Sequence, residues 1–170
     1  MLIRSVILAV VAAAIASQIP TLLKLDQPTE TAAVTAPAAP VSVAPGASGA
    51  AILKADGRGH FTAAFRINGK PVDGLVDTGA SLVAINESTA RRLGFTANSL
   101  DFRYAVDTAN GKTDAAHVVI DRIEIGAIRV RKVDAFVMRD RALSSTLVGM
   151  SFLKKLKSYQ VEDGSLRLTQ

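Results

Sequence analysis

Residues 75–81, with the sequence LVDTGAS, contain the side chain with the clearest potential for chemistry. Asp77 follows two apolar residues and precedes Thr-Gly, which places it where a buried strand enters a tight turn. Gly79 lets the backbone bend and lets another chain approach closely, and Thr78 offers a hydroxyl that can hold the turn. A carboxylate in a rigid, partly buried turn is suited to general acid–base chemistry. The alternative is an ordinary Asx turn at a strand end.

This loop resembles the active-site loop of the retropepsin-like aspartic proteases, whose pattern is two apolar residues, Asp-Thr/Ser-Gly, Ala and Ser/Thr. Two downstream segments strengthen the resemblance. The first, Leu147-Val148-Gly149, matches an apolar-apolar-Gly stretch that packs behind the active-site loop in this family. The second, Thr108-Ala109-Asn110-Gly111, resembles the tip of a flap hairpin, from about residue 103 to 113, that closes over substrate. The resemblance covers residues 55–168 and extends to a bacterial, single-lobe, membrane-anchored branch of the family.

The resemblance implies an aspartic endopeptidase. In that mechanism an ionised carboxylate is the general base for a water, and a second, protonated carboxylate polarises the scissile carbonyl. The chain has a single Asp-Thr-Gly, because Asp107-Thr108 is followed by Ala. One chain therefore supplies half of a site, and the family's solution is a homodimer with Asp77 of each copy on the two-fold axis. The implied partner is a protein or peptide substrate, and the mechanism needs neither a metal nor an organic cofactor.

The resemblance also assigns a role to each residue of the loop. Asp77 is the catalytic carboxylate, and Thr78 braces the two loops against each other across the dimer axis. Gly79 keeps the loop tight. Ala80 and Ser81 complete the loop without taking part in the chemistry.

The elements that must position this loop are predicted to be mostly strands. From residue 51 onward, short apolar runs separated by Gly and Asn indicate an all-β barrel or sandwich with two short helices, and the resemblance selects the single-lobe retropepsin-like barrel. Asn68-Gly69 predicts a hairpin turn between strands at 61–67 and 72–76. Helices are expected at 87–93, between a cap at Asn86 and Gly94, and at 151–157. Further strands are expected at 83–85, 115–120, 122–125, 128–130, 135–137, 146–148, 159–162 and 166–168.

The chain before residue 51 has a different character. Residues 5–23 are uncharged and lie between Arg4 and Lys24, a length that just suffices for a membrane-spanning helix. Because Ala14-Ile15-Ala16 also offers a signal-peptidase motif, we expect residues 1–25 to be either a signal anchor, which we favour, or a cleaved signal peptide. Residues 26–50 are rich in Pro and Ala and predict a disordered linker.

The charge that precedes the apolar stretch predicts its orientation. Arg4 and the terminal amine stay in the cytoplasm, so the remainder of the chain is exported. We therefore expect a single-pass protein of the inner (cytoplasmic) membrane, with residues 51–170 on the periplasmic side as the protease domain.

Composition excludes several other classes of site. The chain has no Cys, which excludes a disulfide scaffold, a thiolate metal site and a cysteine nucleophile. Its two His residues, His60 and His117, have no paired spacing, so a His-based metal site or a Ser-His-Asp triad is not expected. The net charge of +5 comes from interspersed charges, and aromatic residues are only 5%, so a nucleic-acid surface is not expected either.

Two other functions remain open at this point. The first is a catalytically inactive, dimeric peptide-binding or scaffold module of the same fold. A decayed site is expected to lose Asp77 or Thr78, and the chain has both, which favours catalysis. The second is a protease that cleaves only itself, within the linker.

Overall fold

The computed structural model describes residues 44–45, 49–108 and 111–170. All of them belong to one compact unit, residues 39–170. The predicted signal anchor and the predicted linker up to residue 43 lie outside the described residues, so both stay predictions. Within the described ranges, no helix has the length and hydropathy that a membrane crossing requires.

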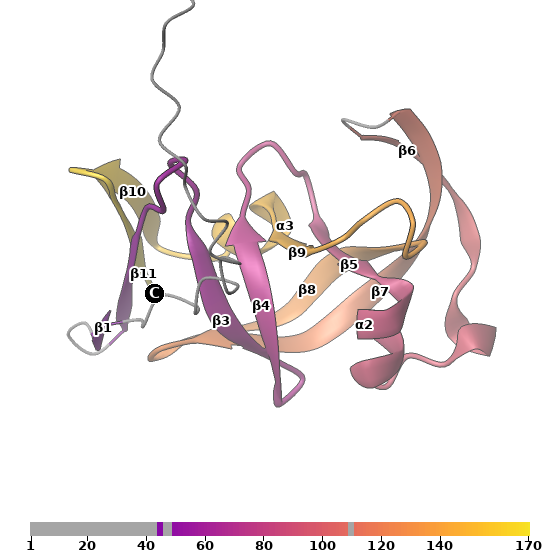
Figure 1. Ribbon diagram of the computed structural model, residues 1–170. Helices are drawn as coiled ribbons and strands as arrows, with labels where there is room; N and C mark the ends of the chain where they lie inside the picture. The colour runs from indigo at the N-terminus through magenta and orange to yellow at the C-terminus, as the bar shows by residue number, and fades with distance from the viewer. Residues whose placement is uncertain (1–43, 46–48, 109–110) are drawn as a thin grey trace, which may run out of the picture. The chain divides into compact units, whose positions relative to one another are not determined.

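A closed barrel carries the candidate site (Figure 1). Its strands follow one another around the barrel in the order β3 (Thr62–Ile67), β4 (Lys70–Val76), β9 (Thr146–Val148), β5 (Val83–Asn86), β8 (Ile128–Met138) and β7 (Gly111–Ile125). Pairing of β3 with β7 closes the barrel. Strand β6 (Phe102–Thr108) extends the sheet beyond β7 and forms a hairpin with it.

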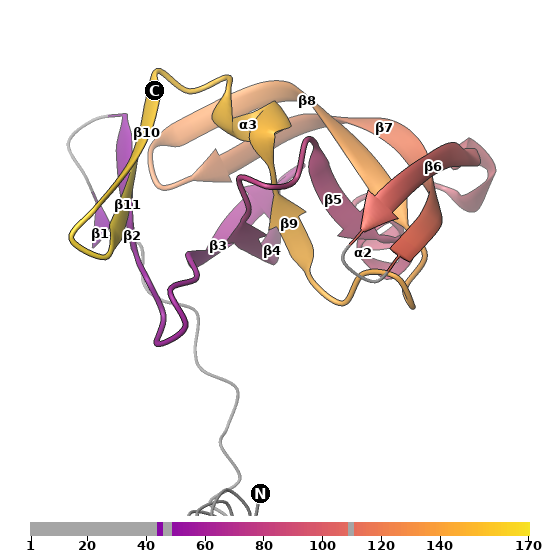
Figure 2. The same cartoon turned by 90° about the horizontal axis from the view of Figure 1, so that it is seen from above.

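A second sheet is built from both ends of the described chain. Its order is β1 (Ala44–Pro45), β2 (Ala50–Lys54), β11 (Ser165–Thr169) and β10 (Ser158–Glu162). Strand β1 and the first residue of β2 fall within residues 26–50, which the sequence analysis predicts to be a linker. Figures 1 and 2 both show the β10–β11 hairpin and β6 at opposite ends of the sheets.

Alternating apolar residues bury one face of most strands in a common core. In β3 the pattern places Ala63, Phe65 and Ile67 inside, each 1% exposed or less. Phe65 meets Phe152 edge to face, with ring centroids 6.2 Å apart. Burial of a side chain of this size contributes about 1.5–3 kcal/mol, so this core holds the strands around the site in register.

Several predicted elements are confirmed. Asn68 and Gly69 form the hairpin turn with φ of 47° and 82°, the left-handed region that Asn and Gly tolerate. Helix α2 (Glu87–Arg92) begins after Asn86, whose side chain accepts a hydrogen bond from the Thr89 amide. The strand at 146–148 has the predicted bounds, and the C-terminal hairpin turns at Asp163-Gly164.

Other boundaries differ from the prediction. The expected strands at 115–120 and 122–125 are parts of the 15-residue strand β7, and those at 128–130 and 135–137 are parts of the 11-residue strand β8. Charged residues interrupt the apolar pattern at these points but lie on the exposed face, as Asp121 and Lys132 do in their ion pair. The expected helix at 151–157 is the shorter α3 (Met150–Leu153).

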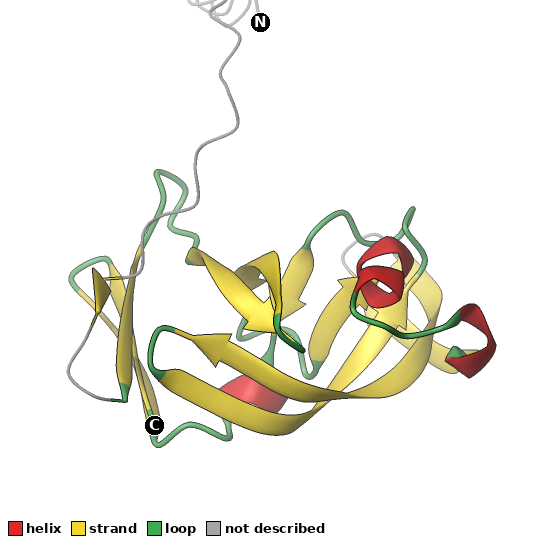
Figure 3. Cartoon of the chain, turned by 90° about the horizontal axis from the view of Figure 1, so that it is seen from below, coloured by secondary structure: helices red, strands yellow, loops and turns green. Residues whose placement is uncertain are grey.

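Three elements were not predicted at all. They are β1, β2 and the short 3-10 helix η1 (Ala97–Ser99). Figure 3 shows α2 and η1 close together on one side of the strands.

Candidate active site

Asp77 lies directly after β4, in the predicted turn. Its backbone amide donates to the Val148 carbonyl (3.1 Å), which ties the start of the loop to β9. The Gly79 amide donates to Asp77 Oδ1 (2.8 Å), and the Ala80 amide donates to the Asp77 carbonyl (3.3 Å). The loop is therefore an Asx turn, as the plainer alternative expected, and this turn holds a half-buried carboxylate in one orientation.

The segment at 147–149 packs behind this loop. Strand β9 runs parallel to β4, with Leu75 beside Leu147 and Val76 beside Val148. The Met150 amide then donates to the Ala80 carbonyl (2.8 Å). A Cβ on Gly149 would lie 2.3 Å from the Leu82 carbonyl oxygen and 2.5 Å from that of Ala80. Only glycine lets the loop approach β9 this closely.

Ser151 is a supporting residue that the sequence analysis missed. Its hydroxyl accepts a hydrogen bond from the Val83 amide (2.9 Å) and donates to the Asp134 carbonyl (2.7 Å). It thus joins the end of the active-site loop to β8. A lone serine after Gly149 gives no local signal, because both of its partners are distant in sequence.

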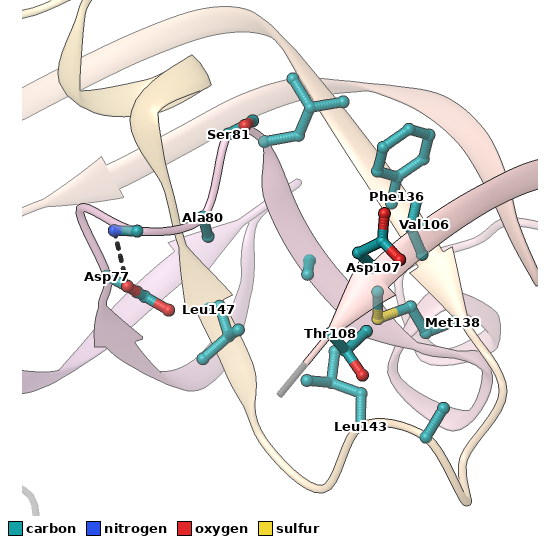
Figure 4. A pocket seen from close by; sticks show the side chains of 14 residues that line it. Asp77, Ala80, Ser81, Val106, Asp107, Thr108, Phe136, Met138, Leu143 and Leu147 are labelled. Atoms are coloured by element: carbon teal, nitrogen blue, oxygen red, sulfur yellow. Dashed lines mark hydrogen bonds between the residues drawn. The ribbon is translucent and has the colours of Figure 1, made fainter. Parts of the chain in front are cut away.

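A cleft of about 540 Å³ opens beside Asp77 (Figure 4). The active-site loop contributes Asp77, Gly79, Ala80 and Ser81, so the structure brings together most of the predicted loop residues. The rest of the lining is mainly apolar. Leu82 and Ala84 follow the loop directly, and distant segments contribute Val106, Phe136, Met138, Ala142, Leu143 and Leu147. Such a cleft fits a peptide with apolar side chains better than a small charged metabolite.

The predicted flap is the hairpin of β6 and β7. Thr108 lines the cleft, and its hydroxyl donates to the Gly111 carbonyl (2.8 Å) across the hairpin. Lys112 Nζ pairs with Asp107 Oδ1 at 2.8 Å on the same hairpin. Ala109 and Asn110, the predicted tip, lie outside the described residues.

Two of the predicted site residues, Thr78 and Val148, do not line the cleft. Thr78 is exposed and lines a second hollow on the other side of Asp77, together with Tyr159 and Val161. Val148 is fully buried behind the loop. Neither histidine lines the cleft, since His60 faces Asp56 and His117 faces Asp134. Within the described ranges, no group of three or more His, Asp or Glu side chains could hold a metal ion.

The loop that carries Ala142 and Leu143 is anchored by Asp140. Its carboxylate accepts hydrogen bonds from the Ser88 hydroxyl (2.7 Å) and the Ser88 amide (2.9 Å). These bonds, together with the nearby Arg91 guanidinium, hold the pKa of Asp140 below its ordinary value of 3.8. Beside it, Arg139 pairs with Glu87 and stacks 3.6 Å over the Phe102 ring. One wall of the cleft is thus fastened to α2 by an ionised carboxylate.

Acid is expected to release this anchor. The pKa of Asp140 is lower in the folded state than its ordinary value. The stabilisation that the ionised carboxylate gives to the fold is therefore present above pH 3.8 and is lost as the pH falls through the folded-state pKa. Asp140→Asn is expected to lower the melting temperature at neutral pH, and the difference from the parent is expected to shrink toward zero as the pH falls below 3.8. Thermal unfolding followed by circular dichroism across this range measures both quantities.

The control is Asp73→Asn, because the exposed Asp73 carboxylate has no hydrogen-bond partner among the described residues. It is expected to change the melting temperature little at any pH. An Asp140→Asn difference that stays constant with pH would contradict the proposed anchor.

Comparison with known proteins identifies the family. The family model described as gag-polyprotein putative aspartyl protease matches residues 63–155, more than half of the chain. The chain belongs to this aspartyl protease family. The match includes the active-site loop, the flap hairpin and the segment behind the loop, and the predicted resemblance is therefore confirmed.

Solved structures agree with this assignment. A retropepsin-like aspartic protease from Rickettsia conorii is 30% identical, with a TM-score of 0.63 over 71% of this chain and 89% of that one. The EIAV protease, solved with an inhibitor, is 18% identical, with a TM-score of 0.50 over 61% of this chain and 93% of that one. The second likeness concerns the fold alone. The barrel is thus that of a retropepsin-like aspartic protease.

Two curated relatives are uncharacterized proteins. The relative from Sinorhizobium sp, encoded in the cobV 5′ region, is 40% identical over 110 residues, which are 65% of this chain and 47% of that protein. RP867 of Rickettsia prowazekii is 32% identical over 120 residues, 71% of this chain and 51% of that protein. The chain spans about half the length of these curated relatives.

Proposed function

We propose that this aspartyl protease family member is an endopeptidase that works as a homodimer, with one water held between the Asp77 carboxylates of two copies. The observation that carries the proposal is the position of Asp77, which is oriented by the Gly79 amide at the wall of the apolar cleft. Family membership supports the same chemistry.

The second carboxylate has to come from another copy. Asp107 also lines the cleft, but it belongs to the flap hairpin, its side chain is 81% exposed, and it is paired with Lys112. A carboxylate neutralised in this way on a hairpin strand is a poor partner for Asp77. A homodimer supplies an identical Asp77 in identical surroundings.

The chemistry follows from the closeness of two like charges. Two carboxylates about 3 Å apart cannot both ionise, so the pair holds one proton, as is established for aspartic proteases. The ionised member removes a proton from the water, which attacks the scissile carbonyl carbon. The protonated member hydrogen-bonds to the carbonyl oxygen. Return of the proton to the amide nitrogen then breaks the C–N bond and restores the pair.

The cleft favours an extended peptide substrate. Such a peptide can pair through its main chain with strand β6 of the flap, while its side chains enter the apolar lining. We expect a preference for apolar residues next to the cleaved bond, because the cleft wall there is formed by Leu82, Ala84 and Leu147.

A peptide library tests the proposal. The full-length chain, purified in a mild detergent, is expected to cut a subset of peptides at apolar positions, with products identified by mass spectrometry. An inhibitor that mimics the tetrahedral intermediate is expected to block the cleavage. Binding of peptides without any cleavage across the pH range would instead support the inactive peptide-binding module.

The place of this activity is a separate proposal. The apolar residues 5–23 and the preceding Arg4 support a single membrane anchor, with the protease domain on the periplasmic side. A reporter enzyme fused after Gln170 is expected to be active only outside the cytoplasm. Activity of a cytoplasm-specific reporter at the same position would exclude this orientation.

A further inference from the structure

Four arginines lie on one face of the barrel wall that β3, β7 and β8 form. Arg66 on β3 pairs with Glu124 on β7, and Glu124 pairs with Arg129 on β8. Two positions along, Arg122 pairs with Arg131 across the same two strands, β7 and β8. Paired residues, and residues two apart along a strand, point to the same side of a sheet. We call this surface, formed by Arg66, Arg122, Arg129 and Arg131, the arginine face.

The arginine face stays positive although it contains a carboxylate. Glu124 accepts a hydrogen bond from Arg129 Nε (2.6 Å) at Oε1, and its Oε2 lies 3.2 Å from Arg122 Nε. The hydrogen bond from Arg129 holds the pKa of Glu124 below its ordinary value of 4.5, so the carboxylate is ionised at neutral pH and offsets one of the four positive charges. Asp73, farther along β4, lines a separate hollow together with Arg92. Three positive charges of the arginine face therefore remain without a counter-charge.

These charges are available to a ligand in solution. Arg66 and Arg131 are exposed and have no ion-pair partner among the described residues, and Arg129 is 60% exposed despite its pairing. A hollow of about 480 Å³ lies between Arg66 and Arg129, with Glu124 in its wall. A guanidinium group presents several N–H donors in one plane, a geometry that matches the oxygens of a phosphate.

The chain enters the domain beside the arginine face. The carbonyl of Gly49, directly before β2, accepts a hydrogen bond from the Gln170 amide (2.8 Å). The Gln170 side chain bonds both main-chain groups of Arg129, because Oε1 accepts from the Arg129 amide (2.7 Å) and Nε2 donates to the Arg129 carbonyl (2.6 Å). The segment that leads to the proposed membrane anchor therefore joins the domain next to these arginines.

The tether is long enough for the domain to meet the bilayer with this face. Between Lys24, after the apolar stretch, and Ala44 there are 19 residues, which span about 60 Å when fully extended as polyproline II. A domain held within this distance experiences a high effective concentration of lipid headgroups, so a weak attraction suffices for docking. Each arginine close to an anionic surface is expected to strengthen binding about fivefold.

We propose that the arginine face docks the domain on anionic phospholipid headgroups of the membrane that holds the N-terminal anchor. The inference rests on the proposed anchor, because the tether is what brings the face to the bilayer. An acidic protein could also offer negative charge. The position beside the tether favours the lipid surface, since the bilayer is the one partner that the chain itself keeps nearby.

Docking in this way leaves the cleft open. The flap strand β6 pairs with β7 from Gly111 to Ala116, whereas Arg122 lies near the other end of β7. Asp77 likewise follows the end of β4 that lies away from the hairpin turn next to Arg66. We therefore expect the docked domain to act on protein segments close to the membrane surface.

Vesicles of defined charge test the docking surface. The full-length chain is reconstituted in phosphatidylcholine vesicles with or without about 30% phosphatidylglycerol. Because the chain has no Cys, Ala127→Cys in the exposed β7–β8 turn provides a single site for a fluorophore. Quenching by lipids with nitroxide-labelled headgroups then gives the ratio of docked to free domains. We expect a higher ratio in the anionic vesicles and its loss at about 1 M salt, which screens the attraction.

Arg66→Gln combined with Arg131→Gln removes two charges that no carboxylate pairs with among the described residues. Both side chains are exposed, so the fold is expected to persist, and the docked-to-free ratio is expected to fall at least about tenfold. The matched control is Arg103→Gln combined with Arg141→Gln, two exposed arginines outside the arginine face. It is expected to leave the ratio within about threefold of the parent. Circular dichroism checks the fold of both double variants.

Three results would overturn the inference. The first is an equal docked-to-free ratio in neutral and anionic vesicles. The second is equal weakening by the two double variants. The third is binding of soluble polyglutamate without docking on anionic vesicles, which is the result expected for an acidic protein partner.

Failure of the other proposals gives different results. Extraction of the chain from vesicles by alkaline carbonate refutes the anchor, and an extracted chain that still sediments with anionic but not with neutral vesicles supports the arginine face. Salt-sensitive docking by a chain that cleaves no peptide supports the arginine face and refutes the protease. Peptide cleavage by a chain that does not dock overturns the arginine face and leaves the protease intact.

Discussion

Asp77→Asn is expected to lower the rate of peptide cleavage at least about 10²–10⁴-fold, the contribution of general acid–base catalysis. The side chains are nearly isosteric, and the amide oxygen can still accept the hydrogen bond from the Gly79 amide, so the loop is expected to keep its shape. In the proposed dimer the change replaces both carboxylates. No group then remains to take the proton of the water or to return it to the leaving nitrogen. Steady-state cleavage of a peptide found in the library measures the effect.

Two controls isolate the role of this carboxylate. Asp73→Asn makes the same chemical change at an exposed position on β4 that does not line the cleft, and it is expected to leave the rate unchanged. A chelator is likewise expected to have no effect. The aspartic mechanism is wrong if Asp77→Asn cleaves as fast as the parent, or if the chelator abolishes an activity that Asp77→Asn retains.

Gly149→Ala is expected to be the most damaging small substitution behind the site. The added methyl group would lie 2.3 Å and 2.5 Å from the Leu82 and Ala80 carbonyl oxygens, which belong to the backbone of the active-site loop. No rotamer change can relieve such a contact, so β9 and the loop have to separate. We expect a loss of about 3 kcal/mol or more in the free energy of unfolding. For a domain of this size, that lowers the melting temperature by about 10 °C.

The loss of stability is expected to come with a loss of activity, because the displaced loop carries Asp77. Denaturant unfolding and peptide cleavage, measured on the same preparation, test both effects. Gly57→Ala is the control, since a methyl group at Gly57 meets no atom within 4 Å. If Gly149→Ala were as stable and as active as Gly57→Ala, the close packing of β9 behind the loop would not be what holds the site.

The loop that carries Asp77 could be predicted from the sequence because its geometry depends on neighbouring residues. Asp77, Gly79 and Ala80 form their turn through hydrogen bonds that span two or three positions along the chain. The Asn68-Gly69 hairpin and the Asn86 cap are local in the same sense. Each was predicted from residue types that favour a particular backbone conformation over a few residues.

Strand lengths could not be predicted with the same success. The charged residues within β7 and β8 interrupt the apolar pattern in the sequence and therefore predict strand ends. A strand with one exposed face can carry charges on that face while its other face stays buried, so these residues do not end the strands. Whether two short apolar runs belong to one strand depends on the partner strand. In this barrel β7 pairs with β8, from Ala115 opposite Met138 at one end to Ile125 opposite Ile128 at the other. Because of this pairing, each strand continues past its polar residues.

By itself, the sequence determined the family, the loop that carries Asp77 and the all-β class, since these depend on a short motif and on alternating apolar residues. Only the tertiary structure decided what surrounds Asp77. The carbonyl oxygens that exclude a side chain at Gly149, the link through Ser151 and the second hollow, which Tyr159 and Val161 line, all involve residues far apart along the chain. Such contacts form only when the barrel closes, because burial of the shared core, rather than any local preference, brings these segments together.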